Sequence, residues 1–484
     1  MTSTPPKPHL SHADIRIILI GVGVAMFLGA LDQTIIAAAL PAIAAELGGF
    51  SAISWVASIY LLTATAVTPL YGKYSDIKGR RAALMLGVTI FVIGSVACAL
   101  APSMLWLIAA RALQGLGGGG LISLAQTIVA DIVAPKERGR YQIYFASVFL
   151  LSSLLGPTLG GFFTQHLHWT LIFWINVPLG ALAYVISNPA LKRLPRHERP
   201  HELDVLGAVL LVLATVTLML ALADGGTAYA WMSPQILGLL GTSVLLWLLF
   251  IWRISRAHEP LIPLSMLNND VVARATVAAA CGMGAYIGLS IYLPVYFQSA
   301  RGMSITDSGL GLIPLMGGTV IGATLAGQMM GRSRPYKRIP ASGRFFAMLG
   351  ALVLTLWADR LPLPVFGIVL ALISIGLGTV LPTTTVAVQN AVELHQLGTA
   401  TGTMNFFRQL GSAITVAIFG ALLNASGIGG ADIDSSAALP PGSFTAIFTA
   451  TTIGFAVAFL FILWMKERPL RASARQAAES VAAD

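Results

Sequence analysis

Three charged side chains are expected to lie deep inside long apolar runs of this 484-residue chain, and they are its best candidates for chemistry. They are Asp32, Arg111 and Arg408. A charge at hydrocarbon depth in a membrane is costly and usually functional. Asp32 and Arg111 are expected about 12–14 Å below the outer surface, at a rise of about 1.5 Å per helical residue. At equal depth they can face each other across a cavity.

A carboxylate beside a guanidinium is a group that protons and cargo can compete for. A neighbouring positive charge favours the ionised form of an acid, and a proton neutralises it. Asp32 and Arg111 are therefore predicted to couple proton movement to transport. The other interpretation is a static ion pair that fixes helix packing. For Arg408 a structural and a functional role both stay open.

A short polar loop at 72–81 has the sequence GKYSDIKGRR. Its glycines permit close helix approach and a sharp turn, and its aspartate can accept hydrogen bonds from a helix N-terminus or an arginine. The loop is predicted to be a latch that closes an inner gate in one state and releases it in another. The latch residues are Gly72, Asp76, Gly79, Arg80 and Arg81. A basic loop that serves only membrane topology is the alternative.

Glycines and a proline cluster in the fourth and fifth apolar runs. Such residues let helices pack backbone to backbone and bend. They are Gln114, Gly115 and Gly117 after Arg111, and then Gly156, Pro157, Gly160 and Gly161. A helix-packing motif is expected here, and a purely structural kink is the simpler interpretation.

Composition defines the elements that must hold these residues. The chain is 56% hydrophobic and 10% charged, whereas a soluble domain has roughly 25% charged residues. This excludes a soluble enzyme, a disordered chain and a nucleic-acid-binding module. A spanning helix needs about 20 apolar residues. Fourteen runs qualify: 15–40, 51–71, 82–101, 104–127, 140–165, 171–188, 204–223, 235–252, 271–296, 307–330, 341–358, 363–388, 399–424 and 443–464.

Basic residues predict the orientation. Of the 29 Lys and Arg residues, 25 fall on the side of the termini, Arg344 among them, and only Arg301 and Arg360 fall opposite. Because cytoplasmic loops are rich in Lys and Arg, both termini are expected in the cytoplasm. The basic excess therefore marks topology rather than a nucleic-acid partner.

Weak internal repetition divides the chain. Gly72 and Gly327, and likewise Gly156 and Gly411, are 255 residues apart. Transporters are often built from such repeats. The expected parts are a cytoplasmic tail at 1–14, six-helix bundles at 15–188 and 271–464, linkers with a two-helix insert at 189–270, and a tail at 465–484. The second copy of the latch, Gly327 to Arg338, has Gly331 in place of the acid, so the latch is expected to be asymmetric.

Longer motifs carry a resemblance. The stretch from Leu31 to Pro41 is similar to L-D-x-T-I-V-x-x-A-L-P, and Trp169 to Gly180 matches a segment between spans five and six. With the loop at 72–81, these make the chain resemble the major facilitator superfamily, in its fourteen-span drug:proton antiporter branch. The resemblance implies an all-α membrane protein of two six-helix bundles with two additional central helices.

The same resemblance implies the activity. A multidrug efflux transporter of this branch exports lipophilic or cationic toxic compounds across the cytoplasmic (inner) membrane by alternating access. The proton gradient supplies the energy, so no cofactor is expected.

The cargo is expected at the midplane between the bundles. The candidate residues of the cargo site are Gln33, Trp55, Tyr60, Gln126, Tyr286 and Gln389. For each of them, a role in helix packing is the alternative. One intramembrane acid suits neutral or monocationic cargo better than dications.

The sequence can be compared with two other functions. A proton-coupled transporter of a specific metabolite, siderophore or nutrient remains an alternative. A membrane-embedded enzyme is disfavoured, because no Ser/His/Asp or paired-carboxylate arrangement is evident. No metal site is expected either, because no H-x-x-x-H spacing occurs on any span.

Overall fold

Apolar runs form the helices, and short polar or glycine signals end them. The Ser103 hydroxyl accepts a hydrogen bond from the Trp106 backbone N–H at 3.3 Å, and the Asn269 side chain caps the helix that follows it. Gly79, with φ of +89°, makes the sharp turn between the second and third helices. This turn favours glycine because a side chain is strained in that conformation.

The computed structural model describes residues 12–49, 52–192, 202–330, 335–425, 442 and 444–470. The N-terminal half contains α1 (His12–Leu47), α2 (Ile53–Lys78), α3 (Arg80–Ala99), α4 (Met104–Gly118), α5 (Leu121–Ile132), α6 (Pro135–His166), α7 (Leu171–Trp174) and α8 (Asn176–Leu191). The insert contains α9 (Val205–Asp224) and α10 (Pro234–Arg256). The C-terminal half contains α11 (Leu264–Leu267), α12 (Asp270–Ser299), α13 (Ile305–Leu310), α14 (Ile313–Met330), α15 (Arg338–Trp357), α16 (Leu363–Ala391), α17 (Leu397–Leu423) and α18 (Thr445–Trp464).

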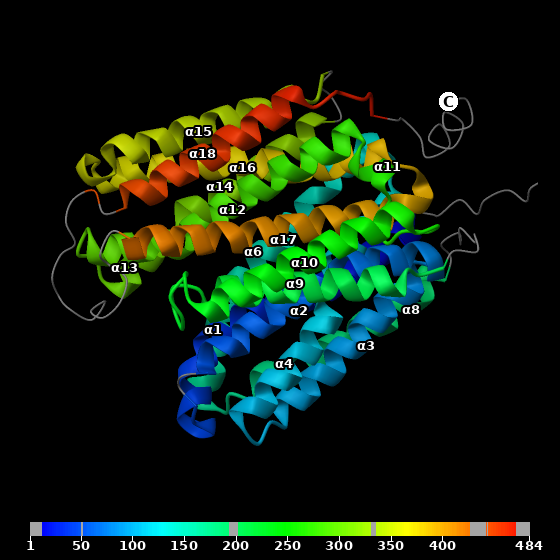
Figure 1. Cartoon of the computed structure of the whole chain (residues 1–484), viewed down its shortest axis with the longest axis horizontal. Coiled ribbons are helices and arrows are strands. Elements are labelled where there is room, and N and C mark those ends of the chain that lie inside the picture. Colours follow the sequence, from blue (N-terminus) through cyan, green and yellow to red (C-terminus); the bar gives the residue numbers. More distant parts are fainter. Residues whose placement is uncertain are drawn as a thin grey trace, which may run out of the picture.

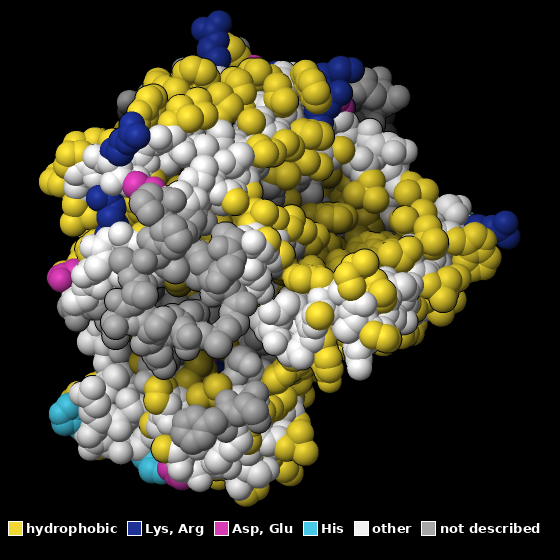
Figure 2. Space-filling view, turned by 60° about the vertical axis from the view of Figure 1, so that its left-hand side comes forward, with side chains coloured by type: hydrophobic (Ala, Val, Ile, Leu, Met, Phe, Trp, Pro, Cys, Tyr) yellow, Lys and Arg dark blue, Asp and Glu magenta, His cyan; other side chains and the backbone are white. Residues whose placement is uncertain are grey.

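Within these ranges, 14 helical segments are long and apolar enough to cross a membrane, which confirms the predicted number. Three of them are interrupted. The fourth breaks at Gly119–Gly120 between α4 and α5, and the sixth and tenth are likewise divided into α7–α8 and α13–α14. Charged side chains are few on the flank shown in Figure 2, and hydrophobic side chains cover much of it.

The spans form two bundles that meet along a seam (Figure 1). In the N-terminal bundle α1 packs against α6 and α8, and α3 packs against α4. In the C-terminal bundle α12 packs against α17 and α18, and α16 packs against α14 and α15. Across the seam, α2 contacts α17 and α6 contacts α14.

Burial along the seam changes from one side of the protein to the other. We call the side where α1 begins and α18 ends the basic side, and the opposite one the far side. Residues 64–69 of α2 and 397–406 of α17 are all buried, and they lie toward the basic side. Residues 57–59 of α2 and 413–417 of α17, toward the far side, are all partly exposed. The seam is therefore closed on the basic side and open on the far side.

Two glycine crossings close the basic side. A Cβ on Gly72 of α2 would overlap the Gly398 carbonyl of α17, and a Cβ on Gly327 of α14 would overlap the Gly139 carbonyl of α6. Gly72 and Gly327 are the pair that the sequence repetition aligned. Both crossings bring backbones together in a way that only a residue without a side chain permits.

The insert hairpin covers one edge of the seam. Helix α9 contacts both α2 and α17, and α10 packs on α9. The ring of Trp247 on α10 lies 6.2 Å from that of Phe406 on α17, between ring centroids. On the far side, the Asn424 amide donates a hydrogen bond to the Gly226 carbonyl at 3.0 Å. The two extra helices thus join the halves beside α2 and α17, a role that the sequence did not indicate.

Thiol labelling tests the open and closed parts of the seam. Ser58 and Thr65 lie seven residues apart on α2, and hence on one face; Ser58 is partly exposed and Thr65 is 2% exposed. In a variant without Cys98 and Cys281, we expect Ser58→Cys to react with an impermeant thiol reagent added on the far side. Thr65→Cys should stay unreactive there, and equal rates would contradict the described seam.

Candidate functional site: a buried ion pair and an interdomain latch

The Asp32 carboxylate and the Arg111 guanidinium are in direct contact inside the N-terminal bundle. Arg111 Nη1 donates to Asp32 Oδ2 at 2.5 Å, and each side chain is 1% exposed. Asp32 lies on α1 and Arg111 on α4. The depth argument therefore placed the two side chains correctly with respect to each other, but they touch directly rather than across a cavity.

Amide and hydroxyl groups complete the surroundings of the pair. The Gln114 amide donates to Asp32 Oδ1 at 2.8 Å, and the Asn176 amide donates to the same oxygen at 3.1 Å. Both amides also donate to the Ser95 hydroxyl, at 2.7 Å and 3.3 Å. Four helices, α1, α3, α4 and α8, thus supply polar atoms at one point. The sequence motifs contained Gln114 and Asn176 but did not show that they bind this acid, and Ser95 was missed.

The pair is tied to α2 and walled by aromatic rings. Arg111 Nε donates to the Val56 carbonyl at 3.0 Å. The Arg111 guanidinium lies 4.4 Å from the ring centroid of Tyr60 and 5.9 Å from that of Phe173. Tyr60, a predicted cargo contact, is 1% exposed and packs on the arginine instead. Because water is excluded here, either charge would be costly without the other.

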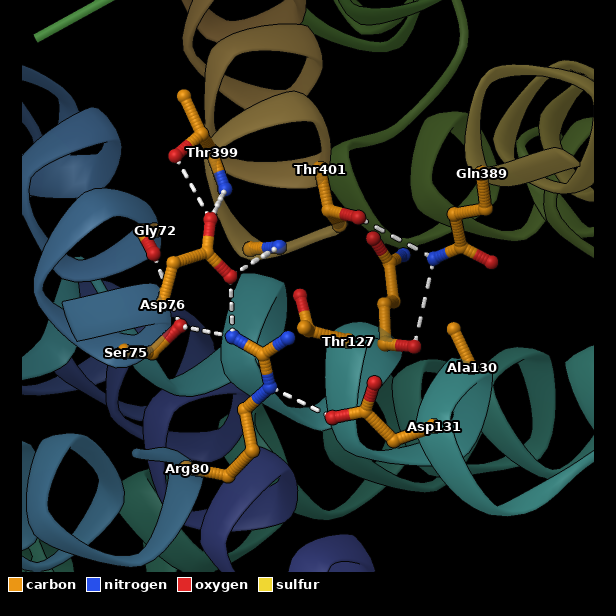
Figure 3. Close-up of polar contacts among 12 residues, drawn as sticks. Gly72, Ser75, Asp76, Arg80, Thr127, Ala130, Asp131, Gln389, Thr399 and Thr401 are labelled. Atoms are coloured by element: carbon orange, nitrogen blue, oxygen red, sulfur yellow. Dashed lines mark hydrogen bonds and ion pairs between the residues drawn. The ribbon is translucent and has the colours of Figure 1, made fainter. Parts of the chain in front are cut away.

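Two of the predicted latch residues, Gly72 and Asp76, meet the start of α17 (Figure 3). The Asp76 carboxylate accepts hydrogen bonds from the backbone N–H groups of Gly398 at 2.9 Å and Thr399 at 2.7 Å. It also accepts one from the Thr399 hydroxyl at 2.7 Å. An acid at a helix N-terminus binds free N–H groups and the positive end of the helix dipole. Asp76 therefore joins the N-terminal bundle to the C-terminal one.

Arg80 holds the latch from the N-terminal side. It pairs with Asp76 and, through Nε, with Asp131 of α5 at 2.6 Å. Its Nη1 also donates to the Ser75 hydroxyl at 2.8 Å. Arg81 points elsewhere and donates to the Asn188 side chain at 2.7 Å. Asp131 and Thr399 were not predicted, because nothing local in the sequence links them to the loop at 72–81.

The packing glycines bring helices into backbone contact. A Cβ on Gly115 or Gly117 would overlap α2 or α3, and one on Gly156 or Gly160 would overlap α1. Gly161 has no atom within 4 Å of its Cβ position. Pro157 lies inside α6. In the second latch copy, Gly331 lies outside the described residues, while Gly327 makes the crossing with Gly139.

A layer of amides closes the seam between the latch and its open part. Asn405 donates to Gln126 Oε1 at 2.8 Å, across the seam. Gln389 donates to the Gln126 carbonyl at 3.3 Å and to the Thr401 hydroxyl at 3.2 Å (Figure 3). Gln126 and Gln389, predicted as cargo contacts, therefore bind each other in this state.

The other predicted wall residues keep some exposure. Gln33 is exposed, and Trp55 and Tyr286 are partly exposed. They lie on α1, α2 and α12. Arg408, on α17, is partly exposed and donates to Asn405 Oδ1 at 3.2 Å.

Arg344 was not predicted to be a buried charge. It lies in α15, is 0% exposed, and its three guanidinium nitrogens have no hydrogen-bond partner. The guanidinium lies 5.2 Å from the ring centroid of Phe455, and a Cβ on Gly282 would overlap it. Arg344 falls within the predicted span 341–358, but α15 begins earlier, at Arg338, so that six residues of helix precede Arg344 inside the bundle.

Comparison with known proteins identifies the family. The model of the Major Facilitator Superfamily matches residues 22–416. Multidrug resistance protein 3 of Bacillus subtilis is 36% identical over 410 residues, which are 84% of this chain and 79% of that relative. The multidrug transporter protein MdtP of the same organism is 32% identical over 412 residues, 84% of this chain and 75% of that relative. The chain belongs to the Major Facilitator Superfamily.

Other matches agree on the fold. An uncharacterised MFS-type transporter of Mycobacterium tuberculosis is 35% identical over 86% of this chain, which spans only 60% of that relative. The crystal structure of the human organic anion transporter MFSD10 aligns with a TM-score of 0.67 at 18% identity, over 95% of this chain and 100% of that one. A bacterial homologue of ferroportin in its outward-facing state aligns with a TM-score of 0.65 at 12% identity, over 93% and 99%. The predicted two-bundle fold of this superfamily is confirmed.

Removing Arg111 and removing Arg344 should have different effects on the stability of the protein. Breaking a buried ion pair costs about 3–5 kcal/mol, whereas replacing unpaired buried charge with an apolar side chain is neutral or stabilising. Arg111→Met is expected to lower the thermal unfolding temperature in detergent, and Arg344→Met to leave it unchanged or raise it. A fall for Arg344→Met would show that its guanidinium has a partner.

One methyl group should disturb the latch. Overpacking costs about 1–3 kcal/mol, and the Cβ of Gly72→Ala would be forced into α17. This variant should shift the protein, by roughly 5- to 150-fold, toward a state open on the basic side. The measurement is reaction of Thr65→Cys with a thiol reagent added on that side. Gly161→Ala is the matched control, and equal reactivity of the two would contradict the crossing.

Proposed function

We propose that this chain exports lipophilic toxic compounds from the cytoplasm in exchange for protons, by alternating access. The observation that carries the proposal is the sealed Asp32–Arg111 pair, tied through α2 to an interdomain latch. Its multidrug relatives support the substrate class, and its excess of basic residues on one side supports a cytoplasmic basic side.

Helix α2 offers a mechanical route between proton and gate. Toward the far side, its Val56 carbonyl accepts a hydrogen bond from Arg111, and its Tyr60 ring covers the guanidinium. Toward the basic side, its Asp76 holds α17. A change in the position of Arg111 would therefore move α2, the helix that carries Asp76.

A proton on Asp32 would start the change. The protonated acid no longer balances Arg111, and an unbalanced guanidinium is unstable in this dry surrounding. Arg111 then moves toward water or cargo and pulls on α2. Asp76 leaves the start of α17, the basic side opens and the far side closes. Cargo binding and loss of the proton to the cytoplasm reverse the steps.

Asp32 is shielded from direct contact with cargo in this state. Its two oxygens accept three described hydrogen bonds and it is 1% exposed. Competition between proton and cargo therefore acts through Arg111 and the α2 surface. This differs from the simplest interpretation of the sequence, in which cargo replaces the proton at the acid itself.

The test uses Asp32→Asn in vesicles with an imposed proton gradient and a lipophilic substrate. Because asparagine cannot take up a proton, uphill transport should be lost while downhill movement persists. The double variant Asp32→Asn/Arg111→Gln removes both charges, keeps the site neutral, and should behave in the same way.

Asp307→Asn is the control, since Asp307 lies away from the pair and its side chain bonds only to Ser304 among the contacts described. It should keep uphill transport. Full uphill transport by the double variant would overturn proton coupling at Asp32. Uptake of the substrate toward the cytoplasmic side on an inward proton gradient would favour a nutrient symporter instead.

A further inference from the structure

Arg408 lies deep in the seam, at the boundary between its closed and open parts. It is eleven residues from the start of α17, or about 16 Å along the axis at 1.5 Å per residue. On one side of it Asn405 bonds to Gln126 in the closed amide layer. On the other side, residues 413–417 of α17 are partly exposed. Arg408 itself is partly exposed, so it lies at the floor of the open part.

The guanidinium of Arg408 has free hydrogen-bonding capacity. An arginine offers five N–H donors in a planar fork. Among the described contacts, its Nη1 donates to Asn405 Oδ1 at 3.2 Å, and no carboxylate pairs with it. Asn405 also donates to Gln126, which holds the amide in place. The charge is therefore positioned but not neutralised.

Among the described residues of these spans, no acidic side chain neutralises the charge of Arg408. Asp32 is neutralised by Arg111, and the pair is sealed in the N-terminal bundle. Arg344 is positive and sealed in the C-terminal bundle. The described helices α14, α16 and α18 contain no charged residue. An open seam with a positive floor attracts anions and repels cations.

Aromatic side chains that keep some exposure lie on both bundles. Trp55 of α2 and Tyr286 of α12 are partly exposed. A ligand that suits both features has a lipophilic body and one negatively charged oxygen-bearing group. A guanidinium binds carboxylate-like groups through paired hydrogen bonds.

We propose that Arg408 binds the anionic group of the cargo, and that the transporter takes lipophilic monoanions such as carboxylates in preference to cations. This rests on the proposed export function and replaces the cationic substrate class suggested by family resemblance. Exchange of one monoanion outward for one proton inward moves two charges. A membrane potential alone, negative inside, would then drive export. One-for-one exchange of a monocation would be electroneutral.

Binding is measured with three probes on one scaffold: pyrenebutyrate, its methyl ester and pyrenebutyl-trimethylammonium. Protein in neutral phosphatidylcholine nanodiscs is compared with empty nanodiscs. Wild type should bind the carboxylate most tightly. A hydrogen bond to a charged group contributes about 1.5–3 kcal/mol, so Arg408→Gln should weaken carboxylate binding roughly tenfold to a hundredfold. Ester binding should not change.

Two further variants separate charge at this site from charge in general. Arg408→Lys should keep part of the preference for the carboxylate. Arg344→Met removes one positive charge from the core of the same bundle and should leave the order of the three probes unchanged. Equal carboxylate affinity in wild type and Arg408→Gln, or a wild-type preference for the trimethylammonium probe, would overturn the proposal.

Transport in vesicles distinguishes this proposal from the export function. Carboxylate export driven by membrane potential alone, and lost in Arg408→Gln, would support both. Uphill, proton-driven export of the cationic probe without that of the carboxylate would overturn the anion preference and leave proton-coupled export standing. The predicted binding order without any proton-driven transport would support the anion preference and overturn proton-coupled export.

Discussion

A charged side chain inside hydrocarbon must be neutralised and hydrogen-bonded by other groups of the protein. The N-terminal bundle is organised around this requirement. Asp32 and Arg111 are each 1% exposed, so neither is hydrated. The Asn176 amide of α8 donates to Asp32, and the Ser95 hydroxyl of α3 accepts hydrogen bonds from Gln114 and Asn176, so four helices converge on one point. Gly115 and Gly117 let α4 approach its neighbours closely enough for that convergence. Removing one partner would leave the other in a medium that cannot solvate it.

The two bundles are unequal in their interiors. The N-terminal one has an acid, a base and amides that satisfy one another. The C-terminal one has a buried arginine without a described partner, packed on Phe455 and fitted against Gly282. The proposed proton chemistry is thus confined to one bundle, while the other supplies the start of α17 that Asp76 contacts and the arginine that faces the open seam.

Helix α2 links the two places where polar groups meet. Its Val56 carbonyl accepts a hydrogen bond from Arg111, and Gly72, which lies where the seam is closed, is 16 residues or about four helical turns further along α2. The insert hairpin packs on the same helix and on α17. Opening the basic side would therefore break the Asp76 contacts, the Gly72 crossing and the amide layer at Gln126 together, a set of small interactions that can switch as a unit.

The sequence by itself determined the spans, their number and the depth of Asp32 and Arg111, because these depend on the length of apolar runs and on a constant rise per residue. It also singled out Gly72 and Asp76, which contact the start of α17. It did not show that Asn176 binds Asp32, that Asp131 holds Arg80, or that Gln126 binds Asn405. These partners lie between 51 and 279 residues apart in the chain. Which side chains meet depends on the rotation and crossing of helices. The burial of Arg344 was missed for the same reason: only packing reveals that its side chain faces the interior of the bundle.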